Sequence, residues 1–444
     1  MRKLTVKNFS VIKEAELEFG KITVLIGPQA SGKSVLCKLA YFLSKRLLEL
    51  AVDSISLDKS EDEFRNLAVA EFAERFPVRV PGAAYNIEFD AGNYSVSIFG
   101  HVANNVGASA LGLDQDAFVN FEFSTQFITL YTAMTHQSQN GQSSGASGIV
   151  QKDEIWTQLN LLLSGDLVLQ SLYAPAGRAF FTNTSLGFKA RRNPDIDPII
   201  DEFAAEIAWG RPWRHVGQVT AGDDVLDSIK QKMDQIVRGE VKVVGSLPRF
   251  NAFDGRNLSL SNLSSGTQEM LPLFNVLGRL ASDQESREIN VKSTFDPPRE
   301  IVPVRSRQLV YVEEPEANVF PSTQYELVRL FARLTHEPNL DFSWVITTHS
   351  PYILTAFNTL IEAWRAGNKP GKREQVATII PEHYWINESD FAAYTIRDGV
   401  LIPIFEKEQE GKEGSGLIDG DYLDSVSDQL GGQFDKLLDI EYAN

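Results

Sequence analysis

The first part of the chain carries two kinds of apolar pattern in succession. Val6 to Phe9 and Ala15 to Phe19 alternate apolar and polar positions, and Lys21 to Gly27 is a short apolar run suited to a buried strand. From Val35 to Leu50 the apolar residues recur every three or four positions, which is the spacing of one helix face. The pattern therefore predicts strands, then a loop, then an amphipathic helix.

The loop between the last of these strands and the helix reads GPQASGKS and matches the P-loop spacing G-x-x-x-x-G-K-[ST]. Its glycines allow backbone N–H groups to wrap a polyphosphate, and the positive end of the helix faces the same anion. We expect Lys33 to reach the β- and γ-phosphates of ATP and Ser34 to bind Mg²⁺. The expected nucleotide-binding residues are Gly27, Pro28, Gln29, Ala30, Ser31, Gly32, Lys33 and Ser34.

Two later apolar segments predict buried strands that end in reactive side chains. The strand Leu309 to Val312 runs into Glu313 and Glu314, and the strand Trp344 to Thr347 is soon followed by His349. Open α/β sheets bind ligands at the carboxyl ends of their strands. We expect Glu313 to orient a water on Mg²⁺ and Glu314 to activate the attacking water. In a chain without a P-loop, two solvated acids and a structural histidine would be the better explanation of these residues.

The segment Asn262 to Leu271, NLSSGTQEML, places Ser, Gly and Thr directly before an apolar run that indicates a helix starting near Glu269. On its own this is typical of a loop and an N-cap. The order of P-loop, LSSGTQ, acidic strand end and histidine strand end resembles the ABC-type ATPase head. In that family the signature loop of one subunit closes on the γ-phosphate held by another.

The resemblance to ABC-type ATPases implies roles for particular residues. Ser264, Ser265, Gly266 and Gln268 would act on a neighbour's nucleotide, and His349 would sense the γ-phosphate. It also implies a homo-oligomer of at least two subunits, with a hexamer as the larger alternative. A transporter ATPase usually carries Asp where this chain has Glu313, so contact between Glu313 and Mg²⁺ through water is expected.

A narrower resemblance comes from EEPEANVFP together with the opening LTVKNFSVIKEAELEFGKITVLIGPQASGKS. These stretches are similar to the OLD-like ATPases, which are grouped with the AAA family and are relatives of SMC heads. Within that group the chain is most similar to the ATPase subunits of PARIS-type anti-phage systems. The resemblance implies a slow, regulatory ATP hydrolase, a separate Toprim-type nuclease effector and a phage-encoded trigger. Asn318 stands where the family has His.

The resulting expectation for the fold is an α/β P-loop NTPase of ABC/SMC-head type with a large mixed α+β insertion between the P-loop and the signature. The expected divisions are residues 1–60 and 251–405 for the two parts of the ATPase lobe, 61–250 for the insertion, and 406–444 for an acidic helical tail. Near residues 170–185 the insertion is expected to return to the core, where APAGRAFF resembles a segment that OLD-like ATPases place near the nucleotide. Arg178 is a candidate functional residue there.

Local patterns predict several elements outside the motifs. Neither sustained heptads nor a CxxC pair is found in the insertion. The patterns predict a hairpin at Gly92 and Asn93, β structure over 118–132, a loop over 135–148, helices over 153–173 and 223–239, a strand over 376–380, a hairpin at Asp398 and Gly399, and a closing acidic helix.

Composition narrows the function classes. The 444 residues exceed the usual size of a single core. The formal charge of −17 argues against a surface devoted to nucleic acid, so direct DNA binding is not expected, although Lys189 to Pro194 is a local basic spot. Cys37 is the only cysteine, and the apolar runs are too short for a membrane span, so a cytoplasmic protein is expected. The rival hypothesis is a DNA-binding clamp of the RecF or SMC kind.

Overall fold

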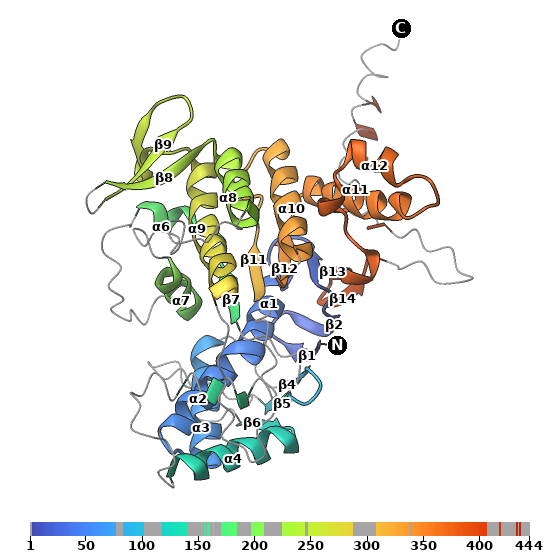
Figure 1. Cartoon of the computed structure of the whole chain (residues 1–444). Helices are drawn as coiled ribbons and strands as arrows, with labels where there is room; N and C mark the ends of the chain where they lie inside the picture. Colours follow the sequence, from blue (N-terminus) through green and yellow to red (C-terminus); the bar gives the residue numbers. More distant parts are fainter. Residues whose placement is uncertain are drawn as a thin grey trace.

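A computed structural model describes residues 2–76, 83–101, 118–139, 170–183, 197–207, 224–244, 247–286, 308–337 and 340–405, with short pieces within 152–163 and 417–436. In this part of the chain an eleven-stranded sheet has the order β6-β5-β4-β1-β2-β14-β13-β3-β12-β11-β7 (Figure 1). A second sheet has the order β10-β9-β8. The fold is that of a mixed α/β P-loop NTPase, because parallel strands with helices on both faces surround the strand that leads into the P-loop.

The strands of the large sheet are β1 Lys3–Phe9, β2 Ile12–Glu18, β3 Ile22–Ile26, β4 Ala84–Asp90, β5 Ser95–His101, β6 Phe118–Phe123, β7 Gln170–Ala174, β11 Gln308–Glu313, β12 Phe342–Thr348, β13 Phe391–Arg397 and β14 Val400–Pro403. Strands β7, β11, β12, β3 and β13 are parallel neighbours. The small sheet consists of β8 Gly239–Val244, β9 Leu247–Ala252 and β10 Asn257–Ser259. All five residues of β3 are buried, which explains its continuous apolar sequence, because helices cover both faces of a parallel sheet.

The α-helices are α1 Lys33–Tyr41, α2 Leu47–Ser56, α3 Glu61–Arg75, α4 Thr125–Gln139, α6 Ala179–Asn183, α7 Pro198–Glu206, α8 Asp224–Val237, α9 Ser265–Ser286, α10 Pro321–His336, α11 Pro351–Gly367 and α12 Arg373–Ile379. A π-helical turn, η1 Phe42–Arg46, joins α1 to α2, and short 3₁₀ turns occur at Leu260–Asn262 (η2), Glu382–Tyr384 (η3) and Glu388–Asp390 (η4). Successive residues of β11 pack into two different cores: Tyr311 into the core that contains α1 to α4, and Val310 into the core that contains α8 to α11.

The segment expected as an insertion extends the ATPase sheet. The predicted hairpin at Gly92 is confirmed: β4 and β5 pair antiparallel, and β4 pairs with β1. The predicted helix over 223–239 is confirmed by α8, and the hairpin at Asp398 by the pairing of β13 with β14. The loop expected over 135–148 is wrong for its first five residues, which belong to helix α4 up to Gln139. Its remainder and most of the expected closing helix lie outside the described residues.

Three further local expectations are wrong. After Phe123 the chain forms helix α4 instead of more strand, because Phe127, Tyr131 and Met134 recur at helical spacing and are all buried. The end of the helix expected over 153–173 is strand β7, which pairs with β11.

The last of these wrong expectations is the strand over 376–380. Val376 N–H donates to Lys372 and Ile380 N–H to Val376, which are helical i→i−4 bonds, so this β-branched run belongs to α12 and its end. The helix of the signature segment also begins earlier than expected, at Ser265 instead of near Glu269.

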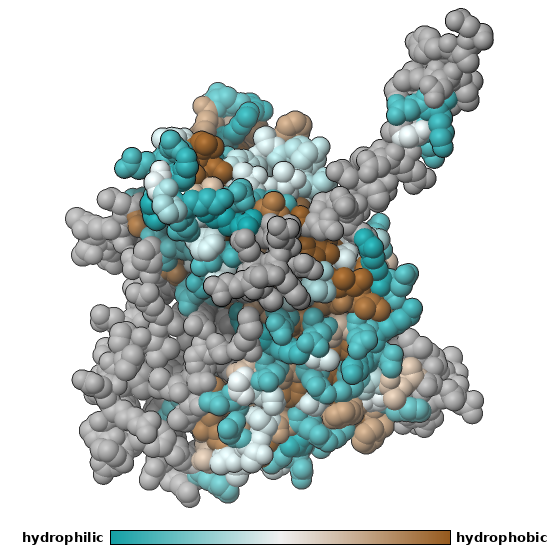
Figure 2. All heavy atoms as spheres, turned by 90° about the vertical axis from the view of Figure 1, so that its right-hand side faces the viewer, coloured by the Kyte–Doolittle hydropathy of each residue, from teal (hydrophilic) through white to brown (hydrophobic). Residues whose placement is uncertain are grey.

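The exposed surface is mixed in character. Figure 2 shows hydrophilic side chains interspersed with small apolar groups on the face that carries α11 and α12. None of the helices in the described ranges has the length and hydropathy needed to cross a membrane.

Candidate functional site

The P-loop, the two acids and the histidine meet at one edge of the sheet. Strand β12 lies between β3 and β11, with Thr348 opposite Ile26 and Thr347 opposite Glu313. Because all three strands are parallel, the segments that follow them emerge side by side. The structure thus places together the groups that the sequence separates by more than three hundred positions.

The P-loop backbone adopts conformations that its glycines make possible. Gly27 has φ of 152° and Gly32 has φ of 108°. A Cβ atom on Gly32 would lie 2.4 Å from Ile12 Cδ1, so a larger residue would clash with the β1–β2 turn. Helix α1 starts immediately afterwards at Lys33, which leaves the first N–H groups of the helix directed at the loop.

Lys33 lies inside the loop that it is expected to serve. Its ammonium donates hydrogen bonds to the carbonyl oxygens of Gly27 and Pro28, each at 2.8 Å. Burial lowers the pKa of Lys33, while the nearby carboxylate of Glu314 opposes that shift. The ammonium is therefore held next to the loop N–H groups, where a phosphate oxygen would replace the two carbonyls as its partner.

The carboxylate of Glu313 is buried and held by two donors. The Tyr173 hydroxyl donates to Oε1 at 2.7 Å, and the Ala176 N–H donates to Oε2 at 3.2 Å. Burial raises the pKa of Tyr173 well above its usual value, so this hydroxyl remains a proton donor. Tyr173 lies on β7, so a strand that was expected to be helical positions one of the catalytic candidates.

Glu314 faces His349. Its Oε1 lies 3.2 Å from His349 Nε2, and the two side chains are 40% and 33% exposed. The backbone of Glu314 has φ of 41°, a left-handed conformation that is rare for a residue with a side chain and is typical of functional sites. Its N–H donates to the Thr347 carbonyl at 2.9 Å, which fixes the turn on the neighbouring strand. A carboxylate and an imidazole are therefore presented together beside the P-loop.

Glu316 is a functional candidate that the sequence reasoning missed. Its Oε1 accepts hydrogen bonds from the Thr348 hydroxyl at 2.7 Å and from the His349 N–H at 2.6 Å. It therefore ties the loop after β11 to the loop after β12 and fixes the backbone of His349. The repeated Glu of EEPE was the available signal, but only the strand order shows where the third carboxylate points.

The signature segment caps its own helix. The Ser264 hydroxyl accepts a hydrogen bond from the Thr267 N–H at 3.4 Å, and Ser264 and Ser265 are exposed. A Cβ atom on Gly266 would lie 2.5 Å from the Asn318 carbonyl oxygen, so the start of α9 rests directly on the loop after Glu314. The Gln268 side chain is buried and donates to the carbonyls of Leu260 and Ser261 at 3.2 and 3.0 Å.

The sequence expectation placed Ser264, Ser265, Gly266 and Gln268 on a neighbour's nucleotide. Within the chain, the two serines and Gly266 lie at the accessible start of the helix, whereas the Gln268 amide is engaged in the preceding turn. Arg178 is buried beneath the strand ends, with 1% of its surface exposed.

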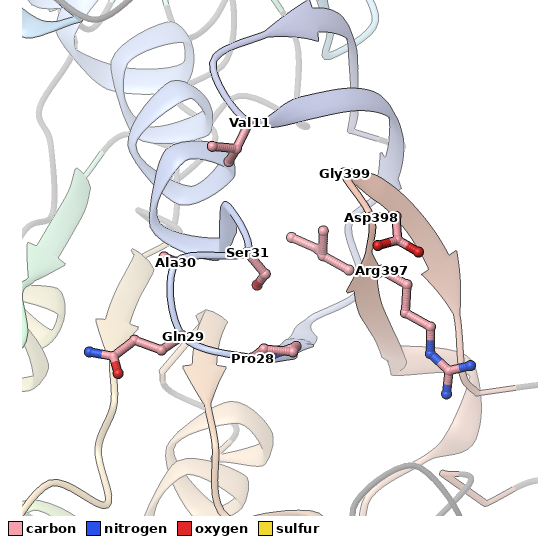
Figure 3. A pocket seen from close by; sticks show the side chains of 9 residues that line it. Val11, Pro28, Gln29, Ala30, Ser31, Arg397, Asp398 and Gly399 are labelled. Atoms are coloured by element: carbon pink, nitrogen blue, oxygen red, sulfur yellow. The ribbon is translucent and has the colours of Figure 1, made fainter.

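A pocket lies against the outer side of the P-loop. It has a volume of about 490 Å³ and is lined by the P-loop from Pro28 to Ser31, by Val11, and by the β13–β14 turn from Ile396 to Gly399 (Figure 3). The Gly399 carbonyl accepts hydrogen bonds from the N–H groups of Lys13 and Glu14, at 2.8 and 3.2 Å, so the two turns that wall the pocket are joined. Its position next to the phosphate-binding loop suits the nucleoside part of a nucleotide.

The residues also fit Mg²⁺ held jointly with a nucleotide. Ser34 is exposed in the first turn of α1, and Glu313 ends β11, which is separated from β3 by β12. The described residues contain no group of three or more His, Cys, Asp and Glu that would hold a metal alone. At a nucleotide site Mg²⁺ typically takes one or two protein oxygens and completes its shell with phosphate and water.

Comparison with family models gives one match, which lies after the P-loop. Residues 189–354 match the family model described as an AAA ATPase domain. No curated protein matches the chain significantly.

The solved structures found by comparison include SMC heads. The SMC head domain from Thermotoga maritima is 12% identical over 91% of this chain and 98% of its own, with a TM-score of 0.36. The Smc head with an extended coiled coil bound to the C-terminal domain of ScpA, from Pyrococcus furiosus, is 11% identical over 91% of this chain and 96% of its own, with a TM-score of 0.35. The P-loop after β3, the acidic end of β11 and the family match establish that this chain carries a P-loop ATPase domain.

Proposed function

We propose that the chain is an ATP-hydrolysing switch that assembles with itself through shared nucleotide sites and holds or releases a separate effector. The observation that carries the enzymatic part is the pair formed by Glu314 and His349, 3.2 Å apart beside the P-loop. A carboxylate next to a phosphate-binding loop has the position of a general base for water.

The proposed reaction converts ATP and water to ADP and phosphate. Glu314 accepts the proton of the attacking water, and His349, whose Nε2 faces that carboxylate, senses the γ-phosphate. Lys33 exchanges its two carbonyl partners for phosphate oxygens. Ser34 and, through water, Glu313 would hold Mg²⁺, which would supply positive charge beside the phosphates.

Exposed serines and apolar side chains at the same edge of the sheet support self-assembly. Ser264 and Ser265 are accessible at the start of α9. Two large apolar side chains flank the site: Phe320, shortly after the loop that touches Gly266, is 74% exposed, and Tyr352, just after His349, is 54% exposed. A second copy of the chain would cover these apolar groups while bringing its serines to the nucleotide.

The cellular role rests on the resemblance to PARIS-type ATPases. That resemblance implies a Toprim-type nuclease that is sequestered until a phage protein is sensed, and the proposal adopts it. The formal charge of −17 supports a protein partner over DNA as the object that is held, because phosphate contacts require clustered basic residues.

The test uses Glu314→Gln, which keeps the shape of the side chain and removes its basicity. We expect turnover to fall by about 10²- to 10⁴-fold, the usual contribution of a general base, while nucleotide affinity stays within about twofold. Lys33→Ala is the control that should lose nucleotide binding. Unchanged turnover in Glu314→Gln contradicts the proposed chemistry.

The partner is tested with the same variant. Glu314→Gln is expressed with its genomic neighbours, purified with ATP and Mg²⁺, and examined for co-eluting chains. A stoichiometric nuclease that is absent from Lys33→Ala preparations supports the switch. Tightly bound DNA, with an affinity that falls steeply between two salt concentrations, would instead support a RecF- or SMC-like clamp.

A further inference from the structure

Arg178 lies where three functional segments converge. It follows β7 in the turn Pro175 to Arg178 and directly precedes α6. Only 1% of the side chain is exposed, which is rare for an arginine that has no compensating partner. The hydrogen-bond and charge partners of the guanidinium therefore indicate what Arg178 does.

The hydrogen bonds of the guanidinium reach all three segments. Nη1 donates to the carbonyls of Glu313 at 2.6 Å and Pro175 at 2.9 Å, and Nη2 donates to the carbonyl of Glu314 at 3.2 Å. Nε donates to the carbonyl of Glu269 at 3.2 Å. One side chain thus connects the end of β11, the first turns of α9 and the turn after β7.

The charge of Arg178 is balanced by the same helix. Glu269 Oε2 lies 3.8 Å from Nε, and the Glu269 side chain is 4% exposed. Burial lowers the pKa of Arg178, and the carboxylate of Glu269 is the largest opposing influence. A buried charge that loses such a partner is strongly destabilised, so the guanidinium and α9 are held together.

The fork of the guanidinium explains why an arginine serves here. Its N–H groups point in fixed directions in one plane, so that Nη1 and Nη2 reach the carbonyls of two successive residues, Glu313 and Glu314. A lysine would keep the charge but offers a single nitrogen. The turn held by Arg178 also contains Ala176, whose N–H binds the Glu313 carboxylate.

We propose that Arg178 is a positioning residue that couples the signature helix α9 to the catalytic strand end of the same subunit. Glu269 lies five residues after Ser264, so a shift of the helix start reaches the backbone of Glu313 and Glu314 through one side chain. A neighbour that engages the signature thereby sets the position of the carboxylates on the first subunit. This coupling rests on the ATP-hydrolysing function proposed above.

The test compares Arg178→Lys with Arg75→Lys in the full chain. Arg75 is the matched control because its side chain is 8% exposed and bonded to the carboxylates of Glu71 and Glu202. Turnover, the affinity for a fluorescent ATP analogue and melting temperature are measured for each variant, with turnover taken well below every melting transition.

For Arg178→Lys we expect turnover to fall by about 10- to 100-fold, because a displacement of about 1 Å costs up to about 10²-fold in rate, with affinity within about threefold of wild type. Arg75→Lys should keep its turnover within about twofold, even where its melting temperature falls. Equal losses of turnover in Arg178→Lys and Arg75→Lys would indicate weakened folding alone and would contradict the proposal.

Glu269→Gln is the second variant, which removes the balancing charge and leaves the backbone acceptor. We expect an intermediate loss of turnover, and the double variant with Arg178→Lys should lose little more than Arg178→Lys alone. The coupling is overturned if a folded Arg178→Lys variant keeps wild-type turnover. If Arg178→Lys does not fold, wild-type turnover in Glu269→Gln overturns the coupling instead. A weakened affinity with unchanged turnover also overturns it, because it indicates a nucleotide contact. A wild-type chain that does not hydrolyse ATP contradicts the proposed function itself.

Discussion

Two neighbouring tyrosines allow the support of Glu313 to be measured against an internal control. The rings of Tyr173 and Tyr311 stack with centroids 5.8 Å apart and planes at 15°, and each residue is 1% exposed. Their hydroxyls differ in partner: Tyr173 donates to the Glu313 carboxylate at 2.7 Å, whereas the Tyr311 hydroxyl and Ser44 Oγ are 3.2 Å apart. Replacing either residue with Phe keeps the stacked ring and removes one buried hydroxyl.

The two losses should differ because one partner is charged. A hydrogen bond to a charged group contributes about 1.5–3 kcal/mol and a neutral one about 0.5–1.5 kcal/mol. Glu313 is 8% exposed, so water replaces the lost donor poorly, while the Ser44 hydroxyl is free to rotate toward another acceptor. We therefore expect Tyr173→Phe to lower the free energy of unfolding by about 1–1.5 kcal/mol more than Tyr311→Phe.

Denaturant unfolding of both variants, with the midpoint and slope compared, gives the difference in stability. ATP turnover gives the second reading: Tyr173→Phe should lose about tenfold or more through displacement of Glu313, and Tyr311→Phe should stay within about twofold. A Tyr173→Phe variant that is no less stable than Tyr311→Phe and equally active would refute the reasoning.

Two further pairs of substitutions test contacts of the loops that follow β11 and β12. Gly266→Ala brings a Cβ atom to within 2.5 Å of the Asn318 carbonyl oxygen, so we expect it to lower stability by about 1–3 kcal/mol, as at other overpacked sites, and to reduce turnover. The control is Ser265→Ala at the adjacent exposed position, which should change stability by less than about 0.5 kcal/mol. Equal melting temperatures for the two variants would contradict this prediction. Glu316→Ala removes the acceptor for the His349 N–H and should reduce turnover by about tenfold, whereas Glu316→Gln keeps one acceptor oxygen and should lose less. Equal losses in the two variants would show that the charge of Glu316 matters instead of its hydrogen bonds.

The sequence was most informative where a motif and its flanking pattern are contiguous. The strand, loop and helix around Lys33 lie within thirty or so positions, and the carboxyl ends of β11 and β12 follow directly from apolar runs that end in Glu313 and His349. Because the carboxyl ends of parallel strands lie at one edge of a sheet, these strand ends are expected to lie together.

The rest depended on partners that are distant in sequence. Tyr173 reaches Glu313 across 140 positions, and Arg178 reaches Glu313 across 135; no local pattern pairs such residues. The strand β7 was expected to be helical because its pairing with β11 cannot be recognised from its own five residues. In α12 the run around Val376 contains β-branched residues and suggested a strand, but the segment is helical and buries none of its residues. A short apolar run of this kind does not by itself distinguish a strand from a helix.

The position of β3 in the sheet also determines when a newly made chain can acquire its nucleotide site. Strand β3 ends at Ile26, but its neighbours β12 and β13 begin at Phe342 and Phe391. At roughly 5–20 residues per second, the ribosome completes β3 roughly 20–70 s before it reaches β13. During that interval β3, whose five residues are all buried in the folded sheet, is an unpaired apolar segment of the kind that chaperones bind. Folding of the ATP site therefore waits until β12 and β13 have been synthesised, and co-expression with chaperones should raise the yield of folded chain.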